Sequence, residues 1–84
     1  MARVMDGKEM NMIGSRLREL RTEKGLSQQA LSDKLQLEAI YVCRGSISRI
    51  EDKLRTVTDN ELYGLAKVLD VRVEDLFEPR KVEE

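Results

Sequence analysis

Apolar residues recur every three or four positions through most of the chain, and this spacing predicts a domain built of α-helices. It places them on one side of each helix, where they can pack against neighbouring helices. We expect these positions to form the core: Ile13, Leu17, Leu20, Leu31, Leu35, Ile47, Ile50, Leu54, Leu62, Leu65, Ala66, Leu69, Val73, Leu76 and Phe77. Arg21 continues the first stripe where another leucine is expected, so its charge needs a partner.

Capping residues and glycine mark the predicted helix boundaries. Gly25 supplies a stop for the first helix, and Ser27 can cap the second. Thr58 and Glu61 have the spacing of a capping box for a fourth helix. A short last helix is expected over residues 73–77. The predicted fold is therefore all-α, with five helices.

The stretch from 42 to 55 has two different faces. At ~100° per residue, Ile47, Ile50 and Leu54 fall on one side. The other side is polar or small and holds Arg44, Gly45, Ser48, Arg49 and Asp52. Two guanidiniums, a hydroxyl and a glycine suit close approach to an anionic surface such as the major groove of DNA. We predict a DNA-recognition helix over about 43–53; the alternative is a solvated helix face.

Length and composition limit the chain to one small domain. With 84 residues, 40% of them hydrophobic and 37% charged, two cores do not fit. We expect a flexible leader over 1–11, the domain over 12–78 and a charged tail over 79–84. No apolar run approaches the ~18 residues of a membrane span, so a cytoplasmic protein is expected. One cysteine and no histidine leave zinc sites and histidine-based triads incomplete, so no metal, cofactor or enzymatic activity is expected.

The charge is unevenly distributed along the chain. The formal net charge is -1, which by itself is unusual for a DNA-binding domain. Residues 13–56, however, hold nine basic and six acidic residues, whereas residues 57–84 hold four basic and eight acidic ones. A partner phosphate is therefore expected to meet the first part of the chain.

Three blocks of sequence together resemble a known family. The runs GLSQQALSDKL, ISRIE and TDNELYGLAKVLDVRVEDLF resemble the phage-repressor and Cro type of helix-turn-helix domain, the xenobiotic-response-element family. The resemblance covers roughly residues 13–77. It implies a compact, lambda-repressor-like bundle of five helices in which helices two and three form the helix-turn-helix. It also implies a transcriptional regulator that acts on palindromic operators.

The resemblance assigns roles to residues that match the family's motif. It implies that Gln28 contacts a DNA phosphate and that Arg55 grips the backbone beyond the recognition helix. The start and outer face of that helix match at Cys43, Arg44, Gly45, Ser48 and Arg49, with the two arginines as candidates for bidentate contacts to guanine. Arg21 and Glu51 match a buried ion pair that joins helix one to helix three.

Three departures from the family pattern affect the docking of helix three. QLEAIY replaces a short glycine turn and is about five residues longer, so helix two continues through Glu38 or Ala39 or the extra residues form a loop. Ile40 and Tyr41 in this insertion either pack on the bundle or form an exposed contact.

Residues near the two ends of the recognition helix are the other departures. Asp52 and Lys53 stand where a polar residue and glycine are usual, so that helix is expected to extend further before it turns. Asp52 is expected to pair with Arg49 or Arg55. Cys43 replaces a Ser or Thr cap; we interpret it as a tolerated small residue rather than a redox sensor.

We hypothesise a small transcriptional regulator that binds double-stranded DNA as a homodimer. In 84 residues self-association must use the domain itself, and the last helix with Phe77 and the tail is the expected surface. The alternative is a protein-interaction module, such as an antitoxin or anti-regulator, supported by the acidic rear half and the apolar insertion.

Overall fold

Helices make up most of the computed structural model, which describes residues 9–78. In chain order it contains α1 (Gly14–Glu23), α2 (Gln28–Leu37), α3 (Arg44–Glu51), α4 (Asp59–Leu69) and the 3₁₀ turn η1 (Val73–Leu76). No strand occurs in the described part, so the all-α prediction is confirmed, whereas the count of five helices is not. None of the described helices is both long and apolar enough to cross a membrane.

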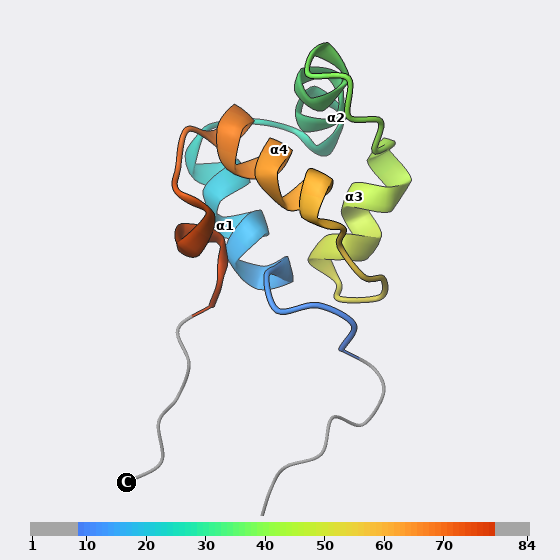
Figure 1. Ribbon diagram of the computed structural model, residues 1–84, viewed down its shortest axis with the longest axis vertical. Helices are drawn as coiled ribbons and strands as arrows, with labels where there is room; N and C mark the ends of the chain where they lie inside the picture. The colour runs from blue at the N-terminus through green and yellow to red at the C-terminus, as the bar shows by residue number, and fades with distance from the viewer. Residues whose placement is uncertain (1–8, 79–84) are drawn as a thin grey trace, which may run out of the picture.

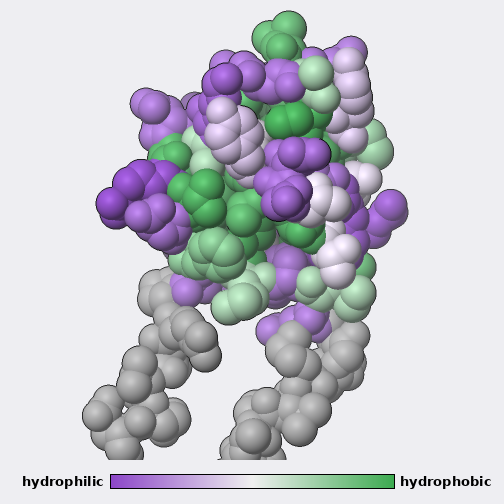
Figure 2. Space-filling model, viewed as in Figure 1, coloured by the Kyte–Doolittle hydropathy of each residue, from purple (hydrophilic) through white to green (hydrophobic). Residues whose placement is uncertain are grey.

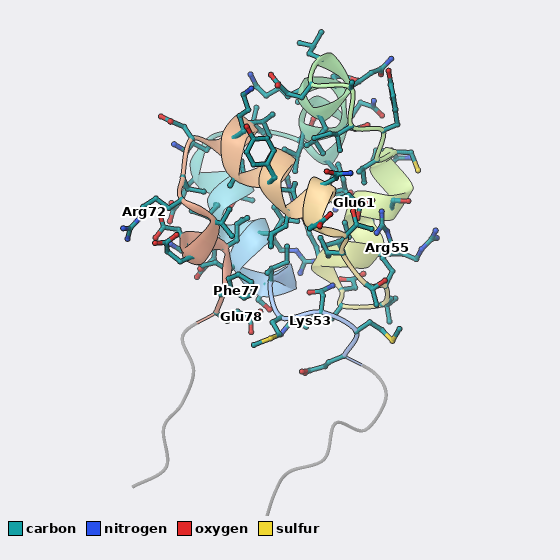
Figure 3. All side chains as sticks on the ribbon, in the orientation of Figure 1. Lys53, Arg55, Glu61, Arg72, Phe77 and Glu78 are labelled. Carbon is teal, nitrogen blue, oxygen red and sulfur yellow. The ribbon has the colours of Figure 1, made fainter. Side chains whose placement is uncertain are left out.

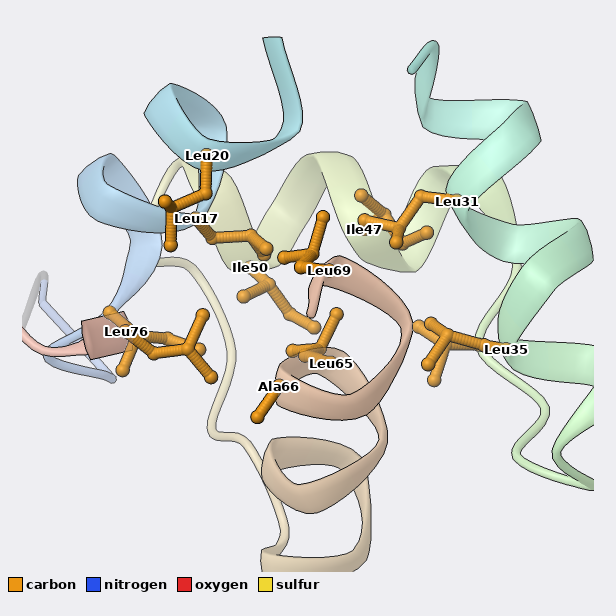
Figure 4. Close-up of a cluster of buried hydrophobic side chains, with 12 residues drawn as sticks. Leu17, Leu20, Leu31, Leu35, Ile47, Ile50, Leu65, Ala66, Leu69 and Leu76 are labelled. Atoms are coloured by element: carbon orange, nitrogen blue, oxygen red, sulfur yellow. The ribbon is translucent and has the colours of Figure 1, made fainter. Parts of the chain in front are cut away.

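The four α-helices surround one core, with α3 packed against α1 and α2 (Figures 1 and 4). Its buried apolar residues are Ile13, Leu17, Leu20, Leu31, Leu35, Val42, Ile47, Ile50, Leu65, Ala66, Leu69 and Leu76. Of the predicted core positions, eleven are buried, and Leu62 and Val73 are partly buried against the core. Leu54 is 57% exposed and Phe77 is 37% exposed, so both predictions of a core position are wrong.

All four α-helices end in the same way, with a residue in the left-handed conformation. These residues are Gly25, Ala39, Lys53 and Asp70, with φ between 59° and 72°. After α3, Lys53 N–H donates to Ile50 O and Leu54 N–H donates to Arg49 O, the pair of bonds that defines a Schellman motif. This turn ends the helix at Glu51 and swings Leu54 away from the core. Helix α3 is therefore shorter than the recognition helix predicted over about 43–53.

Ala39 adopts this left-handed conformation without the freedom of glycine. Its φ is 62° and its side chain is exposed, so the methyl group adds strain and makes no core contact. We expect Ala39→Gly to raise the free energy of unfolding by roughly 0.5–1 kcal/mol in urea denaturation. Ala30→Gly, the same change inside α2, is the control and should destabilise by about 1 kcal/mol. Equal losses in the two variants would contradict a strained Ala39.

The α2–α3 insertion is a fixed element of the fold. Ser32 Oγ donates a buried hydrogen bond to Val42 O at 2.7 Å, and Ile40 packs against the core. An ion pair of 2.9 Å joins Glu38 on this segment to Lys67 on α4. Helix α2 ends at Leu37, before the Glu38 or Ala39 considered from the sequence. Of the two alternatives predicted for the insertion, Ile40 packs on the bundle, whereas Tyr41 is exposed.

Asn11, expected to lie in a flexible leader, connects three parts of the fold. Its side-chain amide donates to Ile50 O at 3.1 Å and to Arg55 O at 2.9 Å. Its Oδ1 accepts from the backbone N–H groups of Ile13 and Gly14 at the start of α1. This one side chain therefore ties the start of α1 to the end of α3 and the loop that follows. Residues 1–8 of the predicted leader and the tail over 79–84 lie outside the described residues.

Candidate nucleic-acid interface

Helix α3 is anchored by one face and presents the other to solvent. Ile47 and Ile50 are fully buried among residues of α1, α2 and α4 (Figure 4). The opposite side and the start of the helix hold the exposed residues Cys43, Arg44, Gly45 and Arg49 and the half-buried Ser48. The two faces predicted from the sequence are thus present on one short rod.

Arg44 and Arg49 carry unpaired charges. Within residues 9–78 neither guanidinium forms an ion pair or a hydrogen bond. The other arginines of the described chain are engaged: Arg16, Arg18, Arg21, Arg55 and Arg72 each pair with a carboxylate. Two arginines on the outer face of α3 are therefore available to an anionic partner without the loss of an internal contact.

Glu51, at the end of α3, connects this helix to α1 and α2 by hydrogen bonds. Arg21 on α1 donates to its two carboxylate oxygens, with Nε 2.6 Å from Oε2 and an Nη 3.1 Å from Oε1. Arg18 on α1 and Gln28 on α2 both donate to Oε1, at 3.2 and 3.0 Å. The Glu51 side chain is fully buried and that of Arg21 is 12% exposed. One carboxylate on α3 thus joins α1, α2 and α3.

The surroundings of Glu51 keep it ionised. Burial by itself raises the pKa of a carboxyl group, but hydrogen bonds from Arg21, Gln28 and Arg18 outweigh it and lower the pKa of Glu51 below its ordinary value of 4.5. The charge is thus stable at neutral pH. Because Gln28 is fixed by one of these bonds, its side chain is oriented at the start of α2 with a second amide N–H unpaired within the described chain.

Arg55 lies just beyond α3 and is bound to α4. Two parallel hydrogen bonds of 2.9 Å join its guanidinium to Glu61, the acidic residue of the capping box predicted at Thr58 and confirmed in the structure (Figure 3). Hydrogen bonding by Arg55 lowers the pKa of Glu61, and Glu61 in turn raises that of Arg55. Arg55 therefore braces the α3–α4 connection and keeps Nε–H unpaired within residues 9–78.

Cys43 is the N-cap residue of α3. The helix has no side-chain cap hydrogen bond at this residue, and the thiol lies 3.5 Å from Ser46 Oγ. Hydrogen bonding from the hydroxyl and the backbone N–H of Ser46 lowers the pKa of the exposed thiol. A serine or threonine oxygen would accept these hydrogen bonds more strongly than sulfur does, so Cys43 is a weak cap for α3.

Some contacts of the site have no clear signal in the sequence. Asp52 was expected to pair with Arg49 or Arg55, but it pairs with Arg18 at 2.7 Å, so that prediction is wrong. The reason is that α3 ends at Glu51, which turns Asp52 toward α1 and away from the outer face. The bonds from Arg18 and Gln28 to Glu51 were also not predicted, because they depend on how the helices cross.

Comparison with known proteins identifies the class. The helix-turn-helix family model matches residues 17–76, so the chain belongs to the helix-turn-helix family, whose regulators bind double-stranded DNA. The chain is thus a DNA-binding regulator of transcription. A search of curated proteins found no match.

Two solved structures resemble this fold. One is the restriction-modification controller protein C.AhdI from Aeromonas hydrophila, with 37% sequence identity, a TM-score of 0.68, and coverage of 77% of this chain and 87% of that chain. The other is the DNA-binding domain of BldD, with 28% identity, a TM-score of 0.69, and coverage of 88% of this chain and all of that chain. Both similarities extend over most of the described residues.

Gly45 is not required by the fold. A Cβ atom at this position would meet nothing within 4 Å, whereas one at Gly14 would lie 2.5 Å from Ile50 O and 2.8 Å from Glu51 O. We expect Gly45→Ala to stabilise the protein by up to about 1 kcal/mol, because alanine is the better helix former. We predict that DNA binding nevertheless weakens, because a duplex that docks on the outer face of α3 would meet the added methyl group.

Thermal unfolding and DNA titration of the same preparation test this pair of opposite effects. Gly14→Ala is the matched control and should lower the unfolding temperature, because backbone carbonyls block its methyl group. If Gly45→Ala binds DNA as tightly as the unchanged protein, Gly45 does not lie at the interface.

Proposed function

We propose that this regulator reads a palindromic operator as a homodimer, with α3 of each copy in the major groove. The observation that carries the proposal is the pair of unpaired, exposed arginines on the outer face of a helix whose inner face is buried. Arg44 and Arg49 each donate in the bidentate geometry that matches guanine O6 and N7. Recognition helices of this class lie in successive major grooves, with half-sites ~34 Å apart.

The remaining site residues position the helix on the DNA backbone. Gln28 has a free amide N–H beside the one held by Glu51, and Arg55 has a free Nε–H. We assign both to phosphates on either side of the groove. Cys43 and Ser48 lie at the start and on the side of α3 and contact the backbone or base edges, while Gly45 allows close approach.

An apolar surface beside η1 supports self-association. A hollow of about 280 Å³ is lined mainly by apolar side chains, which include the exposed Met10, Met12 and Phe77. Figure 2 shows apolar side chains gathered in the lower half of the face in view. We propose that a second copy covers this surface, because exposed apolar groups favour burial. Sedimentation of Phe77→Asp against the unchanged protein tests it: a monomer is expected, and an unchanged mass would contradict this interface.

Selection from a pool of random duplex DNA tests the proposed reading of sequence. We expect enrichment of a short palindrome with guanines in each half-site. Binding to the enriched duplex should weaken steeply with salt, because phosphate contacts release counterions. Equal recovery of all sequences would contradict sequence-specific recognition.

The second candidate is a protein-interaction module, such as an antitoxin or anti-regulator. It is favoured by the exposed Leu37 on α2 and by the acidic second half of the chain. Its test is co-purification with the product of a neighbouring gene. A tight complex together with no enrichment of DNA sequence would favour this function over the operator-reading dimer.

A further inference from the structure

Tyr41 is a large side chain held in solvent by a rigid segment. It is 76% exposed, and its hydroxyl has no hydrogen-bond partner within residues 9–78. The segment that carries it is nevertheless fixed, because Ile40 packs into the bundle and Val42 is buried and bonded to Ser32. The side chain of Tyr41 is therefore accessible to a partner, although both of its neighbours in the chain pack against the core.

The position of Tyr41 relative to α3 indicates what it meets. It lines a hollow of about 340 Å³ together with Cys43 and Ser46, which belong to the start of α3. The rest of the lining comes from Ser32, Gln36 and Val42. This hollow carries hydroxyl, thiol and amide groups and no carboxylate. Tyr41 also lines a second hollow, on the side of α4, which contains the carboxylates of Glu38 and Glu61. Of the two hollows, the one beside α3 therefore suits an anion that accepts hydrogen bonds.

We propose that Tyr41 donates a hydrogen bond from its hydroxyl to a DNA phosphate that flanks the half-site read by α3. The inference rests on the proposed docking of α3, because the N-terminal residues of such a helix contact base edges and bring the backbone close to its first turn. The insertion thus extends the contact with the duplex beyond the helix-turn-helix itself. A neutral donor fixes position on the backbone and adds no sequence preference.

Tyr41→Phe isolates this hydroxyl, because the ring and its contacts remain. On the selected duplex we expect roughly three- to tenfold weaker binding, as one hydrogen bond is lost. The slope of log affinity against log salt should not change, since a neutral donor releases no counterion. Tyr63→Phe is the matched control: Tyr63 is 61% exposed on α4 and does not line the hollow beside Cys43 and Ser46.

Duplexes with single neutral methylphosphonate linkages locate the contact. At one flanking position, the neutral linkage should lower the affinity of the unchanged protein by about the same factor as the Tyr41→Phe substitution does. The same linkage should not lower the affinity of the Tyr41→Phe variant any further. Unchanged affinity of Tyr41→Phe, or additive losses at every flanking linkage, would overturn the proposal. The docking of α3 is tested separately in the same titration: if Arg49→Ala still binds the selected duplex normally, the proposed function itself fails, whatever Tyr41→Phe does.

Discussion

Glu51→Ala is expected to lower the free energy of unfolding by about 3–5 kcal/mol, the cost of leaving a buried charge without its partner. Arg21 is 12% exposed and would keep its charge, while Arg18 and Gln28 would each lose a bond to the same oxygen. The free energy of unfolding of a small domain is only about 5–15 kcal/mol, so a large fraction of the Glu51→Ala molecules would unfold on mild heating. Urea denaturation followed by circular dichroism measures the loss.

Asp52→Ala is the matched control, because Asp52 is the next residue and also pairs with Arg18. That ion pair is about half exposed on both sides, so its loss should cost less than about 1 kcal/mol. Equal losses in Glu51→Ala and Asp52→Ala would contradict the central structural role of Glu51.

The same carboxylate predicts a dependence of stability on pH. The pKa of Glu51 is lower in the folded protein than its ordinary value of 4.5, so its contribution is complete above that value and is lost as the pH falls below it. Glu51→Gln lacks this titration. The difference in unfolding free energy between the unchanged protein and Glu51→Gln should therefore shrink as the pH is lowered below about 4.5. A constant difference down to pH 3 would show that folding does not lower the pKa of Glu51.

Arg44→Ala and Arg49→Ala are each expected to remove about 1–3 kcal/mol of discrimination in favour of the selected duplex. The fold should be unaffected, because neither guanidinium has a partner within residues 9–78 and exposed substitutions usually change stability by less than about 0.5 kcal/mol. Anisotropy titrations of specific and random duplexes give the discrimination, and thermal unfolding gives the stability.

Arg72→Ala controls for the removal of positive charge in general. Arg72 is exposed and lies on the opposite side of the molecule from Arg55 (Figure 3). Its loss should leave discrimination unchanged. If Arg72→Ala weakens specific binding as much as Arg49→Ala, the effect is one of net charge and the outer face of α3 does not read bases.

Much of this fold follows from interactions between residues close in sequence. The apolar stripes of α1, α2 and α4 and the caps at Ser27 and Thr58 can be predicted because each depends on side chains within a few positions. The end of α3 cannot be predicted in this way. Lys53 takes the left-handed conformation without being glycine, so the sequence has no stop signal there, and Leu54 was placed in the core as a result.

The candidate site also combines features that local sequence predicts with features that depend on how the helices pack. The outward positions of Arg44 and Arg49 follow from helical periodicity alone. The cluster around Glu51 depends on helix crossing, and only the partnership with Arg21 was implied, by resemblance to a family. Asn11 shows no periodic pattern, and its role depends on carbonyl groups exposed where α3 ends, a boundary that the sequence does not mark.

The most direct test of base reading by α3 removes one acceptor atom from the DNA. In the selected duplex each guanine in turn is replaced by 7-deazaguanine, which lacks N7, and binding by the unchanged protein and by Arg49→Ala is compared. At one position we expect the replacement to weaken the unchanged protein roughly tenfold and to leave Arg49→Ala unaffected, because the bidentate contact is already lost. Losses that are the same for both proteins at every guanine would contradict the reading of bases by Arg49.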